Sequence, residues 1–318
     1  MSAPNQQPQT SLRDALRNFS LRGFRLLLSD HMKERTESVV LWVAIASYLI
    51  HLGLIFLNTQ GLLGIDDNFL KSPIAAIYTP FSIILLYEVY LLIYYIPKSI
   101  TIYIGKQYEI ITLIIIRRIF KDIAYVELTS DWFRDQNDLQ FTFDVVTSLL
   151  LFLLIFVFYL NIKKRQYVAI KGKKEISDNV RKFVTLKQIL ATLLVPVFLV
   201  LSIYAITNWA IVTYQDYTEG ILTFKKINTV FYDDFFTALI IVDVLLLLFS
   251  FFYSNKFYKI IRNSGFVIST ILIKISFQAT GIVNNVLVTA AVSLGCLFLI
   301  IHNMYQRKEK VEELSSIG

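Results

Sequence analysis

The stretch FTFDVVTSLLLFLLIFVFYLN, residues 141–161, decides the fold class because it is apolar almost throughout. About 18 or more apolar residues in a row form a helix that can cross a hydrocarbon core of roughly 30 Å. Lipid cannot satisfy backbone polar groups, so a helix, whose hydrogen bonds are internal, is expected. Other long apolar runs in the chain are Val39–Asn58, Ile74–Ile96, Leu186–Tyr214, Thr229–Tyr253 and Ser264–His302.

The composition of the whole chain agrees with this stretch. Of its 318 residues, 55% are hydrophobic and 17% are charged, whereas soluble domains are about 25% charged. The mean hydropathy is +0.57. The apolar runs are too long and too uniform for the alternating strands of a membrane barrel. We therefore expect an all-α polytopic membrane protein.

Several classes of site have no counterpart in the sequence. The single cysteine, Cys296, lies in an apolar run, and the three histidines are scattered. There is no Walker loop, Rossmann fingerprint, nucleophile elbow or HExxH motif, and no potassium-channel filter. The net charge of +7 comes from basic residues between the apolar runs. We therefore expect no enzyme, no cofactor, no metal site and no nucleic-acid partner.

The N-terminal region is polar. Residues 1–10 are expected to be disordered, and no pattern of a cleaved signal peptide precedes Val39. Ser11–Ser38 combines leucine and phenylalanine with several arginines, which predicts an amphipathic helix. A basic amphipathic helix beside a membrane span usually lies in the headgroup layer. We expect this one to anchor the chain to the membrane surface.

The charges between the apolar runs predict the topology. The linkers Asn161–Lys187 and Ser254–Asn263 are rich in lysine and arginine, which are retained on the cytoplasmic side. Thr59–Pro73 and Ser130–Gln140 are acidic and are expected outside. Both termini are then cytoplasmic. The abundance of Ile, Lys, Phe and Asn suggests an A/T-rich genome, and so a bacterial cytoplasmic membrane.

This topology requires a crossing that hydropathy alone does not predict. Ile74–Ile96 and Phe141–Asn161 must both run inward, so a helix has to return between them. The only segment available is Gln107–Glu127, which carries several charges. We therefore predict that it crosses, which gives about eight transmembrane helices.

A weak internal repeat fits this count. The stretch from Leu86 aligns with the stretch from Ile241, and Glu88 then falls on Asp243. Two four-helix repeats of the same orientation are predicted, related by an axis near the membrane normal. The expected division is residues 1–38, the first repeat 39–161, a basic cytoplasmic loop 162–185, the second repeat 186–303 and a cytoplasmic tail 304–318.

Charged residues within the apolar helices are the candidate site. Each costs about 2.5–3.5 kcal/mol to insert, so such residues are usually functional or paired. Distances along the helices place one acid and one base at similar membrane depth in each half of the chain. The acid and the base can then form an ion pair. These pairs either line a polar path or lock two helices together. Asp144, near the outer end of its helix, is expected to be hydrated instead. The candidates are Glu88, Glu109, Arg117, Arg118, Asp243 and Lys274.

Two functions fit these features. The first is a transport protein or channel for an ion or small polar solute that uses the buried charges, as a homo-oligomer or within a membrane complex. The alternative is a scaffold or sensor that recruits a partner through its basic cytoplasmic segments. An intramembrane enzyme is a weaker third hypothesis. A voltage sensor is not favoured, because it needs several regularly spaced arginines on one helix.

Overall fold

The computed structural model describes residues 23, 24, 26–62, 70, 73, 75–123, 136–169, 178–218, 227–253 and 257–315. Within these residues it is all-helical, with eight α-helices, one short 3-10 helix and no strand. The elements are α2 (Asp30–Thr59), η2 (Ala75–Ile77), α3 (Tyr78–Tyr95), α4 (Ile100–Asp122), α5 (Gln136–Ala169), α6 (Asp178–Thr218), α7 (Ile227–Tyr253), α8 (Phe257–Gln278) and α9 (Gly281–Ser315).

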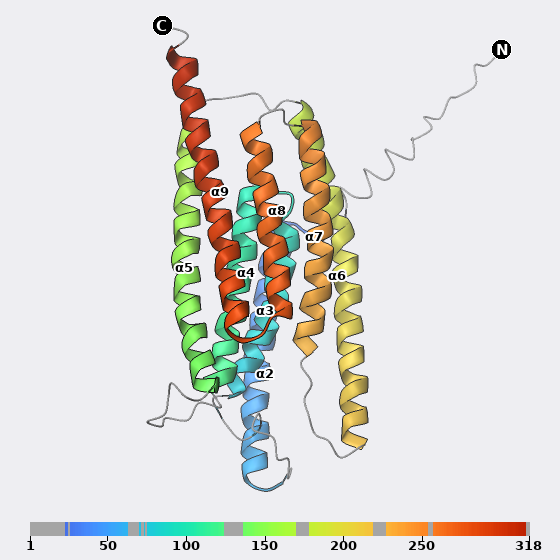
Figure 1. Cartoon of the computed structure of the whole chain (residues 1–318). Helices are drawn as coiled ribbons and strands as arrows, with labels where there is room; N and C mark the ends of the chain where they lie inside the picture. Colours follow the sequence, from blue (N-terminus) through green and yellow to red (C-terminus); the bar gives the residue numbers. More distant parts are fainter. Residues whose placement is uncertain are drawn as a thin grey trace, which may run out of the picture.

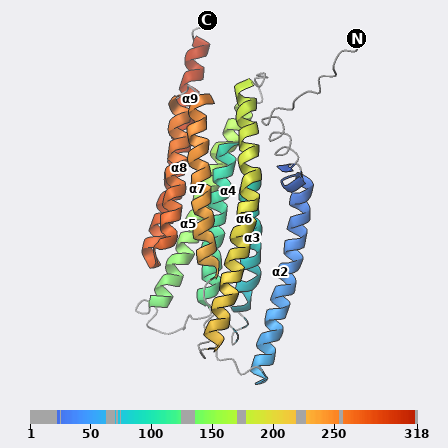
Figure 2. The ribbon, with the colours of Figure 1, turned by 90° about the vertical axis from the view of Figure 1, so that its right-hand side faces the viewer.

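The helices form an up-and-down bundle in which successive helices are antiparallel (Figures 1 and 2). Each helix packs against the next within α2–α5 and within α6–α9, and α5 also packs on α9, α4 on α8 and α3 on α6. We call the end of the bundle at which α2, α4, α6 and α8 begin and α9 finishes the upper end. The opposite end is the lower end.

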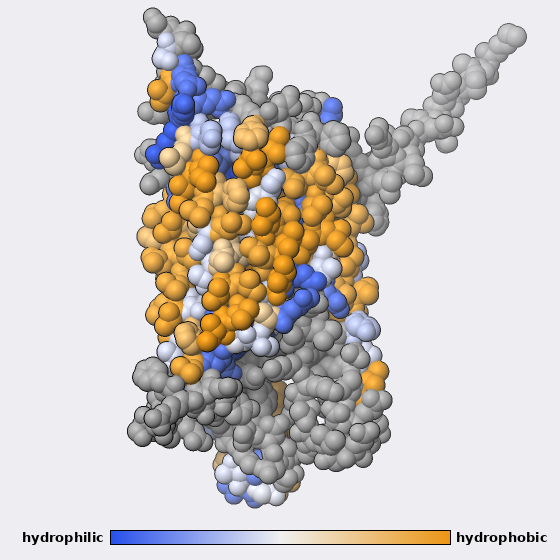
Figure 3. Space-filling view, in the orientation of Figure 1, coloured by the Kyte–Doolittle hydropathy of each residue, from blue (hydrophilic) through white to orange (hydrophobic). Residues whose placement is uncertain are grey.

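The bundle has the surface of an integral membrane protein. Five helical segments are long and apolar enough to cross a membrane, and hydrophobic residues cover the middle of the face seen in Figure 3. Thr79–Tyr95 is a shorter apolar helix. The five segments are Asp30–Thr59, Asp138–Ile162, Lys182–Tyr204, Phe257–Gln278 and Gly281–Glu309.

Several helix boundaries differ from those predicted. Residues 107–122 of the charged segment predicted as Gln107–Glu127 belong to α4, which begins at Ile100, and residues 124–127 lie outside the described residues. The run Ser264–His302 divides into α8, which begins at Phe257, and α9, which begins at Gly281. Gly281 has a φ of 64°, a left-handed conformation that glycine adopts without strain and that allows the sharp turn between the two helices.

The N-terminal prediction is tested only in part. Residues 11–22 and 25 of the predicted Ser11–Ser38 helix lie outside the described residues, and its last part belongs to α2. Ser29 caps this helix by accepting a hydrogen bond from the Met32 amide at 3.3 Å, and Asp30 suits the helix dipole in the first turn. From Asp30 onward the helix is continuous with the apolar run, without a break at Ser38.

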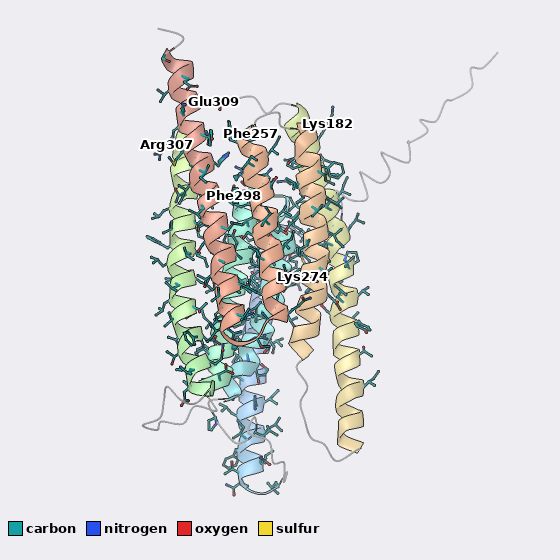
Figure 4. All side chains as sticks on the ribbon, in the orientation of Figure 1. Lys182, Phe257, Lys274, Phe298, Arg307 and Glu309 are labelled. Atoms are coloured by element: carbon teal, nitrogen blue, oxygen red, sulfur yellow. The ribbon has the colours of Figure 1, made fainter. Side chains whose placement is uncertain are left out.

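Glycines bring the central helices close together. A Cβ on Gly295 of α9 would lie 1.6 Å from the Tyr108 hydroxyl of α4, and one on Gly265 of α8 would lie 2.2 Å from the Phe298 ring of α9. Figure 4 labels Phe298 on α9. Small residues let membrane helices approach closely, where van der Waals packing replaces the missing hydrophobic force. The α4–α8–α9 interface therefore depends on these two positions.

Candidate functional site

The charged helix α4 lies inside the bundle, behind α8 and α9 in Figure 1, and packs against α3, α5 and α8. Its neighbours therefore shield most of its polar side chains from lipid. Those side chains take part in three separate clusters, which we call the Asp243, Glu109 and Asp144 clusters after their central acids.

The Asp243 cluster joins α4, α7 and α8. Asp243 of α7 is only 4% exposed, and one carboxyl oxygen accepts a hydrogen bond of 3.1 Å from the Gln107 amide. Thr270 donates to the other end of that amide at 2.8 Å. The buried Tyr103 hydroxyl also lies beside the carboxyl and interacts with it. No cation stands against Asp243 in the described part of the chain.

The Glu109 cluster lies nearer the α5 side of α4. Glu109 accepts hydrogen bonds from the Lys106 ammonium and from the Tyr159 hydroxyl of α5. Glu88 of α3 lies close enough for its charge to interact with those of Lys106 and Glu109. The Lys106 ammonium also lies 5.3 Å from the centre of the Tyr95 ring. The charges of Lys33 and Glu37 of α2 also act on Glu88.

The Asp144 cluster lies near the lower end and joins α4, α5 and α9. Asp144 is fully buried and forms a two-pronged ion pair with Arg118. Asn285 and Gln140 also donate to the carboxyl, at 2.7 Å and 2.6 Å. Arg118 in turn donates to Asn284 at 2.8 Å and to Asn285. The expectation that Asp144 is hydrated is therefore wrong.

The acid–base pairs expected from helix distances do not form. Glu88 was expected to face Arg117 or Arg118, but Arg118 pairs with Asp144. Arg117 is buried, and its guanidinium lies 3.5 Å from the Ser82 hydroxyl of α3. The residue at which α4 begins explains why the expected pairs do not form. Because α4 begins at Ile100 rather than Gln107, Arg117 lies about 25 Å from the upper end, whereas Glu88 lies only about 10 Å from it.

In the second half of the chain, the base expected to pair with the acid also lies at a different depth from the one predicted. Because α8 begins at Phe257 rather than Ser264, Lys274 lies about 25 Å from the upper end of its helix. Asp243 lies about 15 Å from that end of α7. Figure 4 places Phe257 and Lys274 towards opposite ends of α8. Lys274 is half-buried, and Asp243 bonds to Gln107 in the first half instead.

Sequence reasoning missed the uncharged members of these clusters. Amide and hydroxyl side chains are common in membrane helices, and nothing in the sequence assigns Gln107 or Tyr103 to Asp243, because they lie in the other half of the chain. The adjacent amides Asn284 and Asn285 were the signal available for the lower cluster. Within the described residues, no group of three or more His, Cys, Asp or Glu side chains is arranged to hold a metal ion.

Comparisons of the chain with protein-family models, with curated proteins and with solved structures find no match.

Proposed function

We propose that the protein is a membrane transport protein or channel for a small ion, and that the Asp243 cluster is its binding site. The observation that carries the proposal is the burial of the Asp243 carboxyl without a cation beside it in the described part of the chain. An ionised carboxylate in a dry interior is costly unless a counter-charge or a proton accompanies it. A transported cation or proton supplies that charge.

The neighbours of Asp243 suit a cation rather than an anion. The carboxyl, the Thr270 hydroxyl and the Tyr103 hydroxyl place several oxygens together, and oxygen atoms are the ligands of hard cations. With a single carboxylate, a monovalent cation or a proton fits best.

We further propose that all eight helices cross a bacterial cytoplasmic membrane, with both termini inside and the upper end cytoplasmic. The alternating helix directions support this, as does the shielding of α4, because its charges then face protein rather than lipid. The contacts of α4 with α8 and of α5 with α9 support a two-fold repeat, because equivalent helices meet at such an axis.

A flux assay in liposomes tests the proposed transport. We expect the purified protein to conduct or exchange protons, sodium or potassium, and Asp243→Asn to reduce that flux by about 100-fold or more, because the amide carries no charge for the ion to neutralise. The matched control is Asp234→Asn, the same chemical change on the same helix at an exposed position. This control should retain the wild-type flux.

Two outcomes would contradict the proposal. One is an Asp243→Asn variant that folds and conducts like Asp234→Asn. The other is wild-type protein that moves none of the ions tested, which would favour the scaffold or sensor. That alternative relies on the basic segments around residues 11–38 and 162–185, of which residues 11–22, 25 and 170–177 lie outside the described residues. It predicts that neutralising Lys163, Lys164 and Arg165 releases a partner protein in a pull-down.

A further inference from the structure

The side-chain amide of Gln107 lies between the Asp243 carboxyl and the Thr270 hydroxyl, and so connects α4 with α7 and α8. Its Nε2 atom donates to Asp243 at 3.1 Å, and its Oε1 atom accepts from Thr270 at 2.8 Å. Gln107 and Thr270 are 0% exposed and Asp243 is 4% exposed. Because water does not reach these groups freely, their hydrogen bonds have to be made with one another or with the backbone.

The directions of these hydrogen bonds fit an ionised Asp243. A carboxylate accepts hydrogen bonds and cannot donate them, so the amide turns an N–H towards it. The amide oxygen then faces Thr270, whose hydroxyl donates to it. The bond to the charged carboxylate is of the stronger, charge-assisted kind. The observed arrangement therefore stabilises the negative form of Asp243.

A second arrangement of the same side chains satisfies a protonated Asp243. With the amide turned end for end, the new O–H of Asp243 donates to Gln107 Oε1, and Gln107 Nε2 donates to the Thr270 hydroxyl. The Thr270 hydroxyl can donate to the Phe266 carbonyl of its own helix, which lies 3.1 Å from it. A hydroxyl both donates and accepts, so every group keeps a partner. A half-turn of the amide interconverts the two arrangements.

A metal cation suits this chain of hydrogen bonds less well than a proton does. A metal cation needs several oxygen lone pairs turned towards it. The observed amide turns an N–H towards the carboxyl instead, and its oxygen is engaged by Thr270. Asp243 also belongs to no group of three or more His, Cys, Asp or Glu side chains within the described residues. A proton needs no shell of ligands, because it becomes part of the carboxyl group.

The other groups around Asp243 add no competing charge. Tyr103 of α4 is the titratable side chain beside it in the described part of the chain. Helices α6 and α8 pack on α7, and none of their described charged side chains pairs with Asp243. The charge at this position therefore depends on whether the carboxyl carries an ion.

We infer that Asp243 binds a proton and that the Gln107 amide reverses when it does, so that the ion of the proposed transport is a proton. The transport part rests on the proposed function, whereas the binding part does not. The carboxylate takes one proton from water on one side of the membrane and becomes neutral. It becomes negative again when it gives that proton to water on the other side. Gln107 and Thr270 are positioning residues, because they complete the hydrogen bonds of both forms.

Parallel flux assays of the purified full-length protein in liposomes distinguish the ions. We expect proton movement, followed with a pH-sensitive dye, and no movement of radioactive sodium or rubidium. Thr270→Val keeps the shape of the side chain without its hydroxyl and should lower the proton flux by about 10-fold, as expected for one buried hydrogen bond. Thr270→Ser keeps the hydroxyl and should stay near the wild type. Thr207→Val is the matched control, at an exposed threonine whose hydroxyl bonds to the Ile203 carbonyl of its own helix.

Difference infrared spectroscopy between low and high pH measures the carboxyl and the amide separately. The wild type should show the band of a protonated carboxyl that is absent from Asp243→Asn. In protein with isotope-labelled glutamine side chains, the amide band that Gln107→Met removes should change together with the carboxyl band. Gln278→Met, at an exposed glutamine of α8, should leave both bands in place. If Gln107→Met does not fold, Thr270→Val identifies the same amide band by shifting it.

The outcomes separate the inference from the proposed function. Movement of sodium or rubidium without protons, lost in Asp243→Asn, supports the proposed function and overturns the inference. The inference is also overturned if the amide band stays constant while the carboxyl band changes, or if Thr270→Ser loses as much proton flux as Thr270→Val. If the wild type moves no ion, the proposed function fails, and the two infrared bands still decide whether Asp243 binds a proton as inferred.

Discussion

Asp144→Ala is expected to lower the free energy of unfolding by about 3 kcal/mol, among the largest effects for a single side chain of this protein. The substitution leaves the Arg118 guanidinium facing two side-chain amides without its carboxylate, and it deprives Asn285 and Gln140 of their acceptor. The value is at the low end for a broken buried ion pair because Arg118 is 28% exposed and water can partly solvate it.

The measurement is equilibrium unfolding in detergent, with Asp234→Ala as the exposed control, for which a change below about 0.5 kcal/mol is expected. Adding Arg118→Met to Asp144→Ala removes the stranded cation and should recover part of the loss. Equal stabilities for Asp144→Ala and Asp234→Ala would mean that the Asp144 cluster does not hold α4, α5 and α9 together.

Gly295→Ala is expected to destabilise the bundle by about 2–3 kcal/mol, through steric overlap rather than lost charge. Its Cβ would lie 1.6 Å from the Tyr108 hydroxyl and 2.7 Å from the ring carbon that bears it. Tyr108 is fully buried, and its hydroxyl is held by Ser269 at 2.8 Å, so the ring cannot turn away without breaking that contact. Helix α9 or α4 must shift instead.

Gly53→Ala provides the matched control, because a Cβ there meets nothing within 4 Å and alanine is the better helix former. The thermal unfolding midpoint should fall for Gly295→Ala and stay level or rise for Gly53→Ala. Tyr108→Leu in the Gly295→Ala protein removes the overlapping ring and should restore part of the midpoint. If Gly295→Ala behaves like Gly53→Ala, then α9 does not approach α4 as closely as the structure has it.

The sequence was sufficient for the helical fold class because long apolar runs have few physical alternatives. It also located α4, a helix that hydropathy alone would omit, through the charges of the flanking linkers. It did not locate the helix starts. Ile100 and Phe257 begin their helices among basic and polar residues that composition cannot separate from a linker, and that error placed Arg117 and Lys274 at the wrong depth.

The candidate residues remain predictions, but their partners could not have been chosen from the sequence. The spacing of residues along a helix predicts their depth in the membrane. The partner of each side chain also depends on which face of its helix meets which neighbouring helix. Gln107 and Glu109 are close in sequence, yet the first bonds to Asp243 of α7 and the second to Tyr159 of α5. That difference follows from tertiary packing of helices from both halves of the chain.

The enclosed position of α4 has a consequence for biosynthesis. The insertion machinery selects each segment by its own hydrophobicity, and Lys106, Glu109 and Arg118 make α4 a poor substrate on its own. In the proposed topology α4 therefore enters the bilayer only once α5 has emerged from the ribosome, so that the two integrate as a hairpin. With a cysteine introduced into α4, because the natural Cys296 lies far downstream, nascent chains that stop before Gln136 should react with water-soluble cysteine reagents, and chains that extend beyond Ala169 should not.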